Sequence, residues 1–263
     1  MDNTIKVDTW IALQEQLFHN SWDEKLGRFR SPYVYRGLSD VTYNLKTSLM
    51  RLGGSYEDLE RHLLRNFRKY ARRDKISASG TIWNWLAVAQ HYGLPTRLLD
   101  WTYSPYVALH FMTANIDEYD RDGVIWAINY VKVKDYLPTK LKYALIEEGS
   151  NIFTGEILEE ACHTLHEFDS LQKTPFLAFL EPPSLDERIV NQYALFSLLS
   201  DSTYLLNDWL DLHPELYFKI VIPAKLKWEI RDKLDQANIT ERVLFPGLDG
   251  LSVWLRRHYT PRM

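Results

Sequence analysis

The chain has 263 residues, which fits one large domain or one domain with a small appendage. Its apolar fraction of 46% and aromatic fraction of 14% can fill a sizeable core and exclude a disordered chain. The net charge of -4 means that any nucleic-acid surface must be local, and the single cysteine, Cys162, excludes an internal disulfide and a cysteine-rich metal site.

Hydrophobic spacing predicts the elements of the first third of the chain. Apolar residues at helical spacing predict helices over residues 8–19, 56–73 and 81–91. A run of aromatic and β-branched residues from Tyr33 to Arg36 predicts a short strand, and residues 44–50 are also predicted to be extended.

The second of these helices has a strongly basic outer face. A local contact surface for DNA or RNA phosphates is predicted from its arginines, which include Arg61, Arg65, Arg68 and Arg72. The alternative is a face that water alone solvates, which is the commoner fate of a run of charges.

A central stretch, QHYGLPTRLLDWTYSPYVALHF, concentrates polar side chains between apolar ones. Gly93 and Pro95 predict a sharp turn, because glycine tolerates a positive φ and proline fixes φ. Residues 97–101 then predict a buried strand that brings Asp100 to its end.

A helix is predicted to start directly after that strand. Ser104 suits the N-cap and Pro105 the first helical position. A strand end beside a helix N-terminus suits an anionic ligand such as a phosphate. The alternative is a tight corner in which Arg97 and Asp100 pair with each other or cap backbone groups.

The second half of the chain predicts a mixture of strands and helices. Strands are predicted over residues 123–129, 189–199 and 216–222, and helices over 156–167, 224–236 and a last segment ending at Arg256. Because there is no regular βαβ alternation, we expect an α+β fold: a single domain whose split or mainly antiparallel sheet is flanked by helices.

Several common kinds of site have no signature in this sequence. We find no H-E-x-x-H, P-loop, G-x-G-x-x-G or G-x-S-x-G pattern, and no metal site is predicted. No long apolar run or signal-peptide core is present. We therefore expect a cytoplasmic protein without a membrane partner.

Three separated islands carry a family resemblance. They are the tripeptide Tyr35-Arg36-Gly37, the block HYGLPTRLLDWT from His91 to Thr102, and the run from Arg188 to Gln192. With the segment LKTSLMR and the late LFPGLDGL, the sequence from about Tyr33 to Arg256 resembles the FRG domain family. We accordingly divide the chain into an N-terminal helical segment, residues 1–30, and an FRG-like catalytic or binding domain, residues 31–258.

The FRG domain is similar in layout to ADP-ribosyltransferases, which cleave NAD at the nicotinamide ribose. The resemblance implies that Arg36 holds the dinucleotide and that Asp100, Thr102 and Ser104 contact it just before a helix. Gln192 falls where those enzymes have a glutamate. A neutral amide can bind a ribose hydroxyl, but it stabilises a developing cation less than a carboxylate does.

The resulting hypothesis is an NAD-dependent ADP-ribosyltransferase, of toxin or phage-defence type, that modifies nucleic-acid bases. Its catalytic residues would be Gln192, Asp100 and His91. NAD would be held by a larger set, comprising Arg36, Gly37, Thr96, Arg97, Trp101, Thr102, Ser104 and Arg188. Two alternatives remain open: a sensor module that binds a nucleotide or peptide without turnover, and a structural corner with no ligand.

Overall fold

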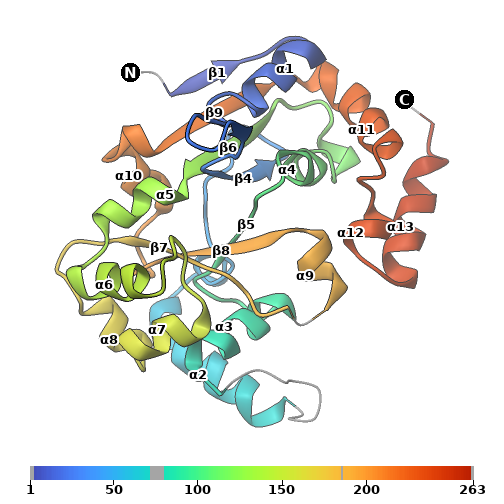
Figure 1. Cartoon of the computed structure of the whole chain (residues 1–263). Coiled ribbons are helices and arrows are strands. Elements are labelled where there is room, and N and C mark those ends of the chain that lie inside the picture. Colours follow the sequence, from blue (N-terminus) through green and yellow to red (C-terminus); the bar gives the residue numbers. More distant parts are fainter. Residues whose placement is uncertain (1–2, 72–79, 185, 262–263) are drawn as a thin grey trace.

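The computed structural model describes residues 3–71, 80–184 and 186–261. These residues form a seven-stranded mixed sheet in the order β1-β9-β6-β4-β5-β8-β7, with helices around it (Figure 1). The strands are β1 (Thr4–Lys6), β4 (Tyr33–Leu38), β5 (Leu99–Thr102), β6 (Gly123–Asn129), β7 (Leu177–Leu180), β8 (Ala194–Leu199) and β9 (Tyr217–Ile222), and β2 (Trp22–Asp23) pairs separately with β3 (Arg28–Phe29).

The helices follow the amphipathic stretches of the sequence. They are α1 (Trp10–Leu17), α2 (Tyr56–Tyr70), α3 (Ile82–His91), α4 (Pro105–Met112), α5 (Tyr130–Val133), α6 (Thr139–Glu147), α7 (Gly155–Ala161), α8 (Leu165–Asp169), α9 (Glu187–Asn191), α10 (Leu206–Asp211), α11 (Lys227–Gln236), α12 (Glu241–Leu244) and α13 (Leu248–His258). The predicted α+β architecture is confirmed. β1 runs parallel to β9, and the other strand pairs of this sheet are antiparallel.

The sheet is almost divided between β4 and β5. Within the described residues these two strands pair at one position, Tyr35 with Thr102. Their outer neighbours pair along their length: β4 with β6 from Tyr33 to Leu38, and β5 with β8 from Leu99 to Thr102. The sheet therefore consists of two well-paired halves that meet at one bridge.

The alternation of side chains along the strands places apolar residues on both sides of this sheet. Leu195 and Leu199 face one cluster, which spans both halves, whereas Phe196 and Leu198 face the other side. On that second side the described residues form two separate clusters. One lies under β5, β8 and β7 against α2, α3 and α6–α8, and the other lies under the remaining strands against α1, α4 and α11.

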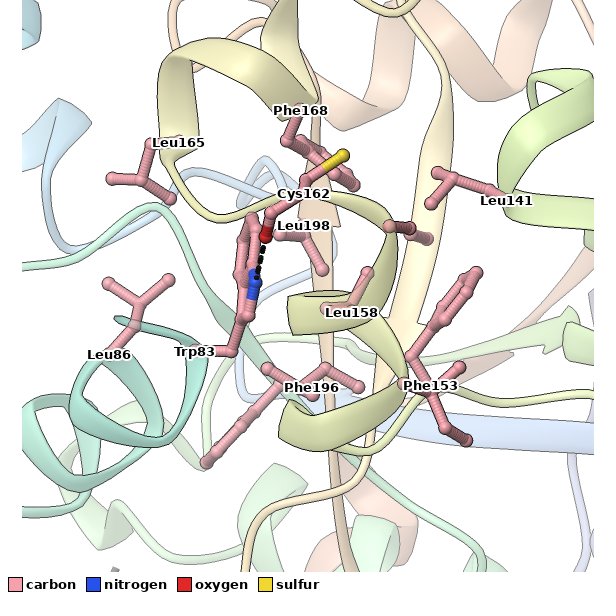
Figure 2. Close-up of a cluster of buried hydrophobic side chains, with 14 of the residues drawn as sticks. Trp83, Leu86, Leu141, Phe153, Leu158, Cys162, Leu165, Phe168, Phe196 and Leu198 are labelled. Atoms are coloured by element: carbon pink, nitrogen blue, oxygen red, sulfur yellow. Dashed lines mark hydrogen bonds between the residues drawn. The ribbon is translucent and has the colours of Figure 1, made fainter. Parts of the chain in front are cut away.

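The cluster under the β5 half is tied together by a buried indole. Figure 2 shows Trp83 of α3 donating from Nε1 to the backbone oxygen of Cys162, at 2.8 Å. Phe168 packs edge-on against the same indole, with ring centroids 5.3 Å apart. Cys162 is itself buried, and burial raises the pKa of its thiol to about 11. It therefore packs as a small apolar residue.

Two predicted elements of the second half are wrong in their extent. The strand predicted over 189–199 is instead the end of α9 followed by β8, because Asp186 caps a helix by accepting from the backbone N–H of Ile189. Tyr193 then turns the chain with a φ of 49°. The helix predicted over 156–167 is two helices, because Thr164 caps a new one.

Two differences concern the first half. Residues 44–50, predicted to be extended, form no strand; 44–47 have no regular secondary structure, Ser48 and Leu49 form a turn, and a short 3-10 helix begins at Met50. The predicted N-terminal helical segment, residues 1–30, also contributes β1 to the main sheet, because Thr4–Lys6 pairs with Lys219–Val221. A three-residue strand is too short to show a period of two in the sequence.

Candidate functional site

A cavity of about 320 Å³ lies where the two halves of the sheet meet. It is on the side of the sheet that carries two separate clusters, between α4 on one half and α3 and α9 on the other. Of the residues predicted to form the site, those that line it are Arg36, Gly37, His91, Asp100, Trp101, Thr102, Arg188 and Gln192. The fold therefore brings the three sequence islands to one place.

Arg36 crosses the gap between the two halves. It follows Tyr35, the β4 residue that pairs with β5, and its Nη1 donates to the backbone oxygen of Asp100 where the strands have diverged. Burial lowers the pKa of the Arg36 guanidinium, and the nearby Asp100 carboxylate, 3.9 Å away, opposes that shift. Within the described part of the chain its Nε has no hydrogen-bond partner. A partly buried guanidinium with a spare donor is suited to an anionic ligand.

Gly37 is required by packing rather than by a ligand. A Cβ added to it would lie 1.9 Å from the backbone oxygen of Ala108 and 2.8 Å from the backbone nitrogen of Met112. Both atoms belong to α4, so the glycine allows that helix to rest directly on β4. This contact fixes one wall of the cavity.

Asp100 presents its carboxylate to the cavity. Its side chain is 60% exposed, and Oδ2 accepts a hydrogen bond from Gln90 Nε2 at 3.0 Å. Gln90 is oriented in turn by Thr96, whose hydroxyl donates to Gln90 Oε1 at 2.6 Å. Thr96 is buried and does not line the cavity, so it affects the site only by orienting Gln90.

His91 forms a pair with Asp186 at the rim. The two side chains lie 2.7 Å apart, between Nε2 and Oδ2, and the imidazole is 8% exposed. A histidine held by a carboxylate can accept and release a proton. Sequence reasoning missed Asp186. Its N-cap position before Glu187 was a signal for a helix start, but nothing in the sequence linked it to His91.

Thr102 and Gln192 hold the opposite wall. The Thr102 hydroxyl donates to the backbone oxygen of Gln192 at 2.7 Å and accepts from the backbone N–H of Ser104 at 3.0 Å. Gln192 Nε2 donates to the backbone oxygen of Leu244 at 2.9 Å. Ser104 caps α4 through Val107 N–H, as predicted, but it does not line the cavity.

Two residues predicted to bind the cofactor have other partners. Arg97 is buried and forms ion pairs with Glu60 and Asp169, and those carboxylates raise its pKa. Trp101 has its indole in the core on the other side of the sheet, where Nε1 donates to Ser197 Oγ at 2.8 Å. The predicted roles of Arg97 and Trp101 in holding NAD do not fit these side-chain positions.

Arg188 lies on the α9 side of the cavity. Its guanidinium is 5.0 Å from the centre of the Phe245 ring. Stacking on an aromatic face orients an arginine without neutralising it. The site therefore has two cationic groups, Arg36 and Arg188, and one exposed carboxylate.

The basic face of α2 borders a separate groove of about 950 Å³. Arg61, Arg65 and Arg68 line it together with Trp85 of α3, and Arg68 lies 5.8 Å from the Trp85 ring centre. Arg72, predicted to extend this face, lies outside the described residues. The other end of α3 carries Gln90 and His91, so one helix runs from the basic groove to the cavity.

Within residues 3–71, 80–184 and 186–261, the His, Cys, Asp and Glu side chains form no group of three that could hold a metal ion. No helix in the same residues has both the length and the apolar character needed to cross a membrane.

Comparison with known proteins found one family match. Residues 31–121 match the model of the FRG domain. This range includes the Tyr35-Arg36-Gly37 tripeptide and the block from His91 to Thr102, and it ends before Gln192. No curated protein and no solved structure matches the chain. The predicted family is therefore confirmed over residues 31–121, where this chain carries an FRG domain.

Proposed function

We propose that the protein is an NAD-dependent ADP-ribosyltransferase whose active site is the cavity between the two halves of the sheet. The observation that supports this most strongly is the position of Arg36. Its guanidinium, on a side chain that is 17% exposed, has a spare donor, lies 3.9 Å from the exposed carboxylate of Asp100 and lines the same cavity as Gln192. This set offers a cation for a diphosphate, an acceptor for ribose hydroxyls and an anion for a developing positive charge.

The cavity size indicates which part of NAD it would hold. At about 320 Å³ it is at the small end of ligand pockets, which span roughly 300–1,000 Å³. That space suits the nicotinamide ribose and its phosphate. In this proposal Arg36 binds the diphosphate, Gln192 accepts from a ribose hydroxyl, and the adenosine half extends toward the surface.

The proposed reaction replaces one bond to the ribose C1′ with another. The bond from C1′ to the nicotinamide nitrogen breaks, and its electron pair leaves with neutral nicotinamide. Asp100 stabilises the cationic ribose, the role that a glutamate would have at the position of Gln192. A nucleophile of the acceptor then bonds to C1′ and loses its proton to His91, which Asp186 orients.

The basic groove supports a nucleic-acid base as the acceptor. Arg61, Arg65 and Arg68 can contact phosphates, and Trp85 offers an aromatic surface. About six residues of α3 separate Trp85 from His91, which is roughly 9 Å along the helix. A strand bound in the groove is thus within a few nucleotides of the cavity.

The test is incubation of the protein with labelled NAD and, separately, DNA, RNA or a protein extract. We expect label on the nucleic acid with the unmodified protein, and at least a tenfold lower rate with Arg36→Ala or Asp100→Asn. Arg28→Ala, at an exposed arginine of β3, is the matched control and should keep full activity. Absence of both transfer and nicotinamide release would refute the proposal.

A sensor module is the second candidate, and the state of Gln192 favours it. Its amide is neutral, and Nε2 ties α9 to the backbone of Leu244. A protein that binds a nucleotide without cleaving it would show NAD affinity by calorimetry that Arg36→Ala abolishes, with no nicotinamide released. Release of nicotinamide would decide for the enzyme.

A further inference from the structure

The last helix, α13, is held to the protein by one face. A Cβ on Gly250 would lie 1.9 Å from the backbone oxygen of Phe245, so the helix packs closely on the turn after α12. Arg257 is buried and forms ion pairs with Glu241 and Asp235. In Figure 1, α13 lies at the edge of the molecule beside α12. The apolar side chains on its opposite face are exposed.

That opposite face carries an exposed apolar stripe. At 100° per residue, four side chains fall within an arc of about 80°, roughly opposite Gly250 and Arg257. They are Leu248, Leu251, Leu255 and Tyr259. Leu248 and Tyr259, at the two ends, are each 78% exposed. A continuous apolar stripe on an anchored helix is a docking surface rather than scattered surface hydrophobicity.

Two charged residues beside the stripe bear on which partner it would bind. Asp249 and Arg256 lie along the same edge of the helix, about 80–100° from Leu248, near opposite ends. When a second α13 packs antiparallel about a two-fold axis, this edge meets the same edge of its partner. Asp249 of one copy then faces Arg256 of the other, twice, and the leucine stripes oppose each other. A parallel pair would instead place this edge against the His258 edge.

We propose that the protein forms a symmetric homodimer through antiparallel packing of α13. The patch is self-complementary in apolar character and in charge, as a two-fold interface requires. Three helical turns form a small contact, so the dimer belongs to the weak, concentration-dependent class. The surface is independent of the cavity and holds whether or not the protein cleaves NAD.

Sedimentation equilibrium at protein concentrations up to about 0.5 mM tests the contact. We expect the unmodified protein to dimerise and L251E/L255E to raise the dissociation constant at least about 100-fold, because four leucines leave the interface. Ile11→Glu is the matched control: it places the same charge at an exposed apolar position on α1 and should leave the dimer intact. A monomeric unmodified protein, or an unchanged L251E/L255E dimer, overturns the proposal.

Charge exchange tests the antiparallel arrangement. Asp249→Arg and Arg256→Asp each create two like-charge pairs, so each variant alone should dimerise about tenfold more weakly. A mixture of the two variants places opposite charges at both pairs, and it should form a heterodimer at least as tight as the unmodified dimer. Circular dichroism confirms that each variant keeps its helices. Failure of the mixture to recover overturns the antiparallel pairing even if the leucine variant dissociates.

Discussion

Gly37 lies where β4 passes closest to α4. Since a Cβ there would overlap the backbone of Ala108, no side-chain rotamer can relieve the clash. We expect Gly37→Ala to lower the free energy of unfolding by about 3 kcal/mol or more, because the helix must move off the strand. Chemical denaturation of both proteins measures this.

Gly80→Ala is the control for this substitution. Nothing lies within 4 Å of a Cβ at Gly80, so its stability should change by less than about 0.5 kcal/mol. Equal stability of Gly37→Ala and the unmodified protein would mean that α4 does not rest on β4 as described.

His110 makes stability depend on pH. Burial and the neighbouring Arg231 lower its pKa from 6.5 to about 3, with Arg257 acting in the same direction and Glu241 opposing. The unfolded chain therefore binds a proton on this histidine between those two values, and the native protein does not. Stability contributed by neutral His110 is complete above pH 6.5 and is lost as the pH falls toward 3.

The measurement compares the unmodified protein with His110→Gln between about pH 5 and pH 7.5. Other groups titrate in both proteins, so the difference between them isolates the histidine. We expect the unmodified protein to lose up to about 1.4 kcal/mol more per pH unit below its unfolded pKa. Parallel stability curves for the two proteins would contradict this assignment.

At the scale of single side chains, the sequence indicated which residues lie near the site, but not which of their charges are neutralised by an ion pair. Arg36 and Arg97 both flank β-strands in the sequence and both were candidates for the cofactor. In the structure Arg36 faces a cavity, whereas Arg97 is enclosed by Glu60 of α2 and Asp169 of α8. Those partners are 37 and 72 residues away, so no local pattern shows them.

A buried indole links helix α3 to the end of α7. Trp83→Phe keeps an aromatic ring in the cluster of Figure 2 but removes the donor to the Cys162 backbone oxygen. We expect a loss of about 1–3 kcal/mol in the free energy of unfolding, because a buried carbonyl loses its partner and the ring leaves a void. Thermal or chemical unfolding measures it.

Trp22→Phe is the matched control, since Trp22 lies on β2 with 54% of its surface exposed. Its effect should stay within about 0.5 kcal/mol. Similar losses for the two variants would show that the Trp83 hydrogen bond adds no stability.

Helices and strands were predictable from the sequence where one hydrophobic pattern continued over many residues. The strand Gly123–Asn129 was predicted with its correct bounds because it is a single apolar run after an Asp-Gly turn. The helices α2 and α11 were predicted because their apolar positions repeat over many residues. The segment 189–199 was misread because its apolar run continues through a helix end, a turn at Tyr193 and a strand. The side chain of Asp186 caps a helix at the start of this segment, and a helix-capping residue is a weaker sequence signal than a run of apolar residues.

The basic groove gives a prediction for the molecule as a whole. If nucleic acid binds there, replacing Arg61, Arg65 and Arg68 by alanine should weaken oligonucleotide binding and reduce the slope of log affinity against log salt by up to about 3. Fluorescence anisotropy at several salt concentrations measures both quantities.

The control removes three cations elsewhere. Lys25, Arg28 and Arg30 are exposed near the β2–β3 hairpin, and their combined replacement by alanine changes the net charge equally. An equal loss of affinity in the two triple variants would assign binding to overall charge, and no binding at low salt would exclude nucleic acid as the acceptor.

For the molecule as a whole, the family resemblance predicted that distant residues would meet in one site. It did not predict how the strands and helices bring them together. The resemblance joined Arg36, Asp100 and Gln192, which the structure places around one cavity. Their meeting depends on the single bridge between Tyr35 and Thr102, a pairing between strands 67 residues apart by number. Pairing at that separation follows from the packing of α3 and α4 on either side, which a local reading of the sequence does not contain.

The order of strands has a consequence for synthesis of the chain. β9 lies between β1 and β6, so β1 has no partner in this sheet until Tyr217–Ile222 has been made. A ribosome-bound chain that stops earlier exposes the pairing edge of β6, an open template for association with other nascent chains. Synthesis of β9 thus covers the exposed edges of two strands that precede it in the chain.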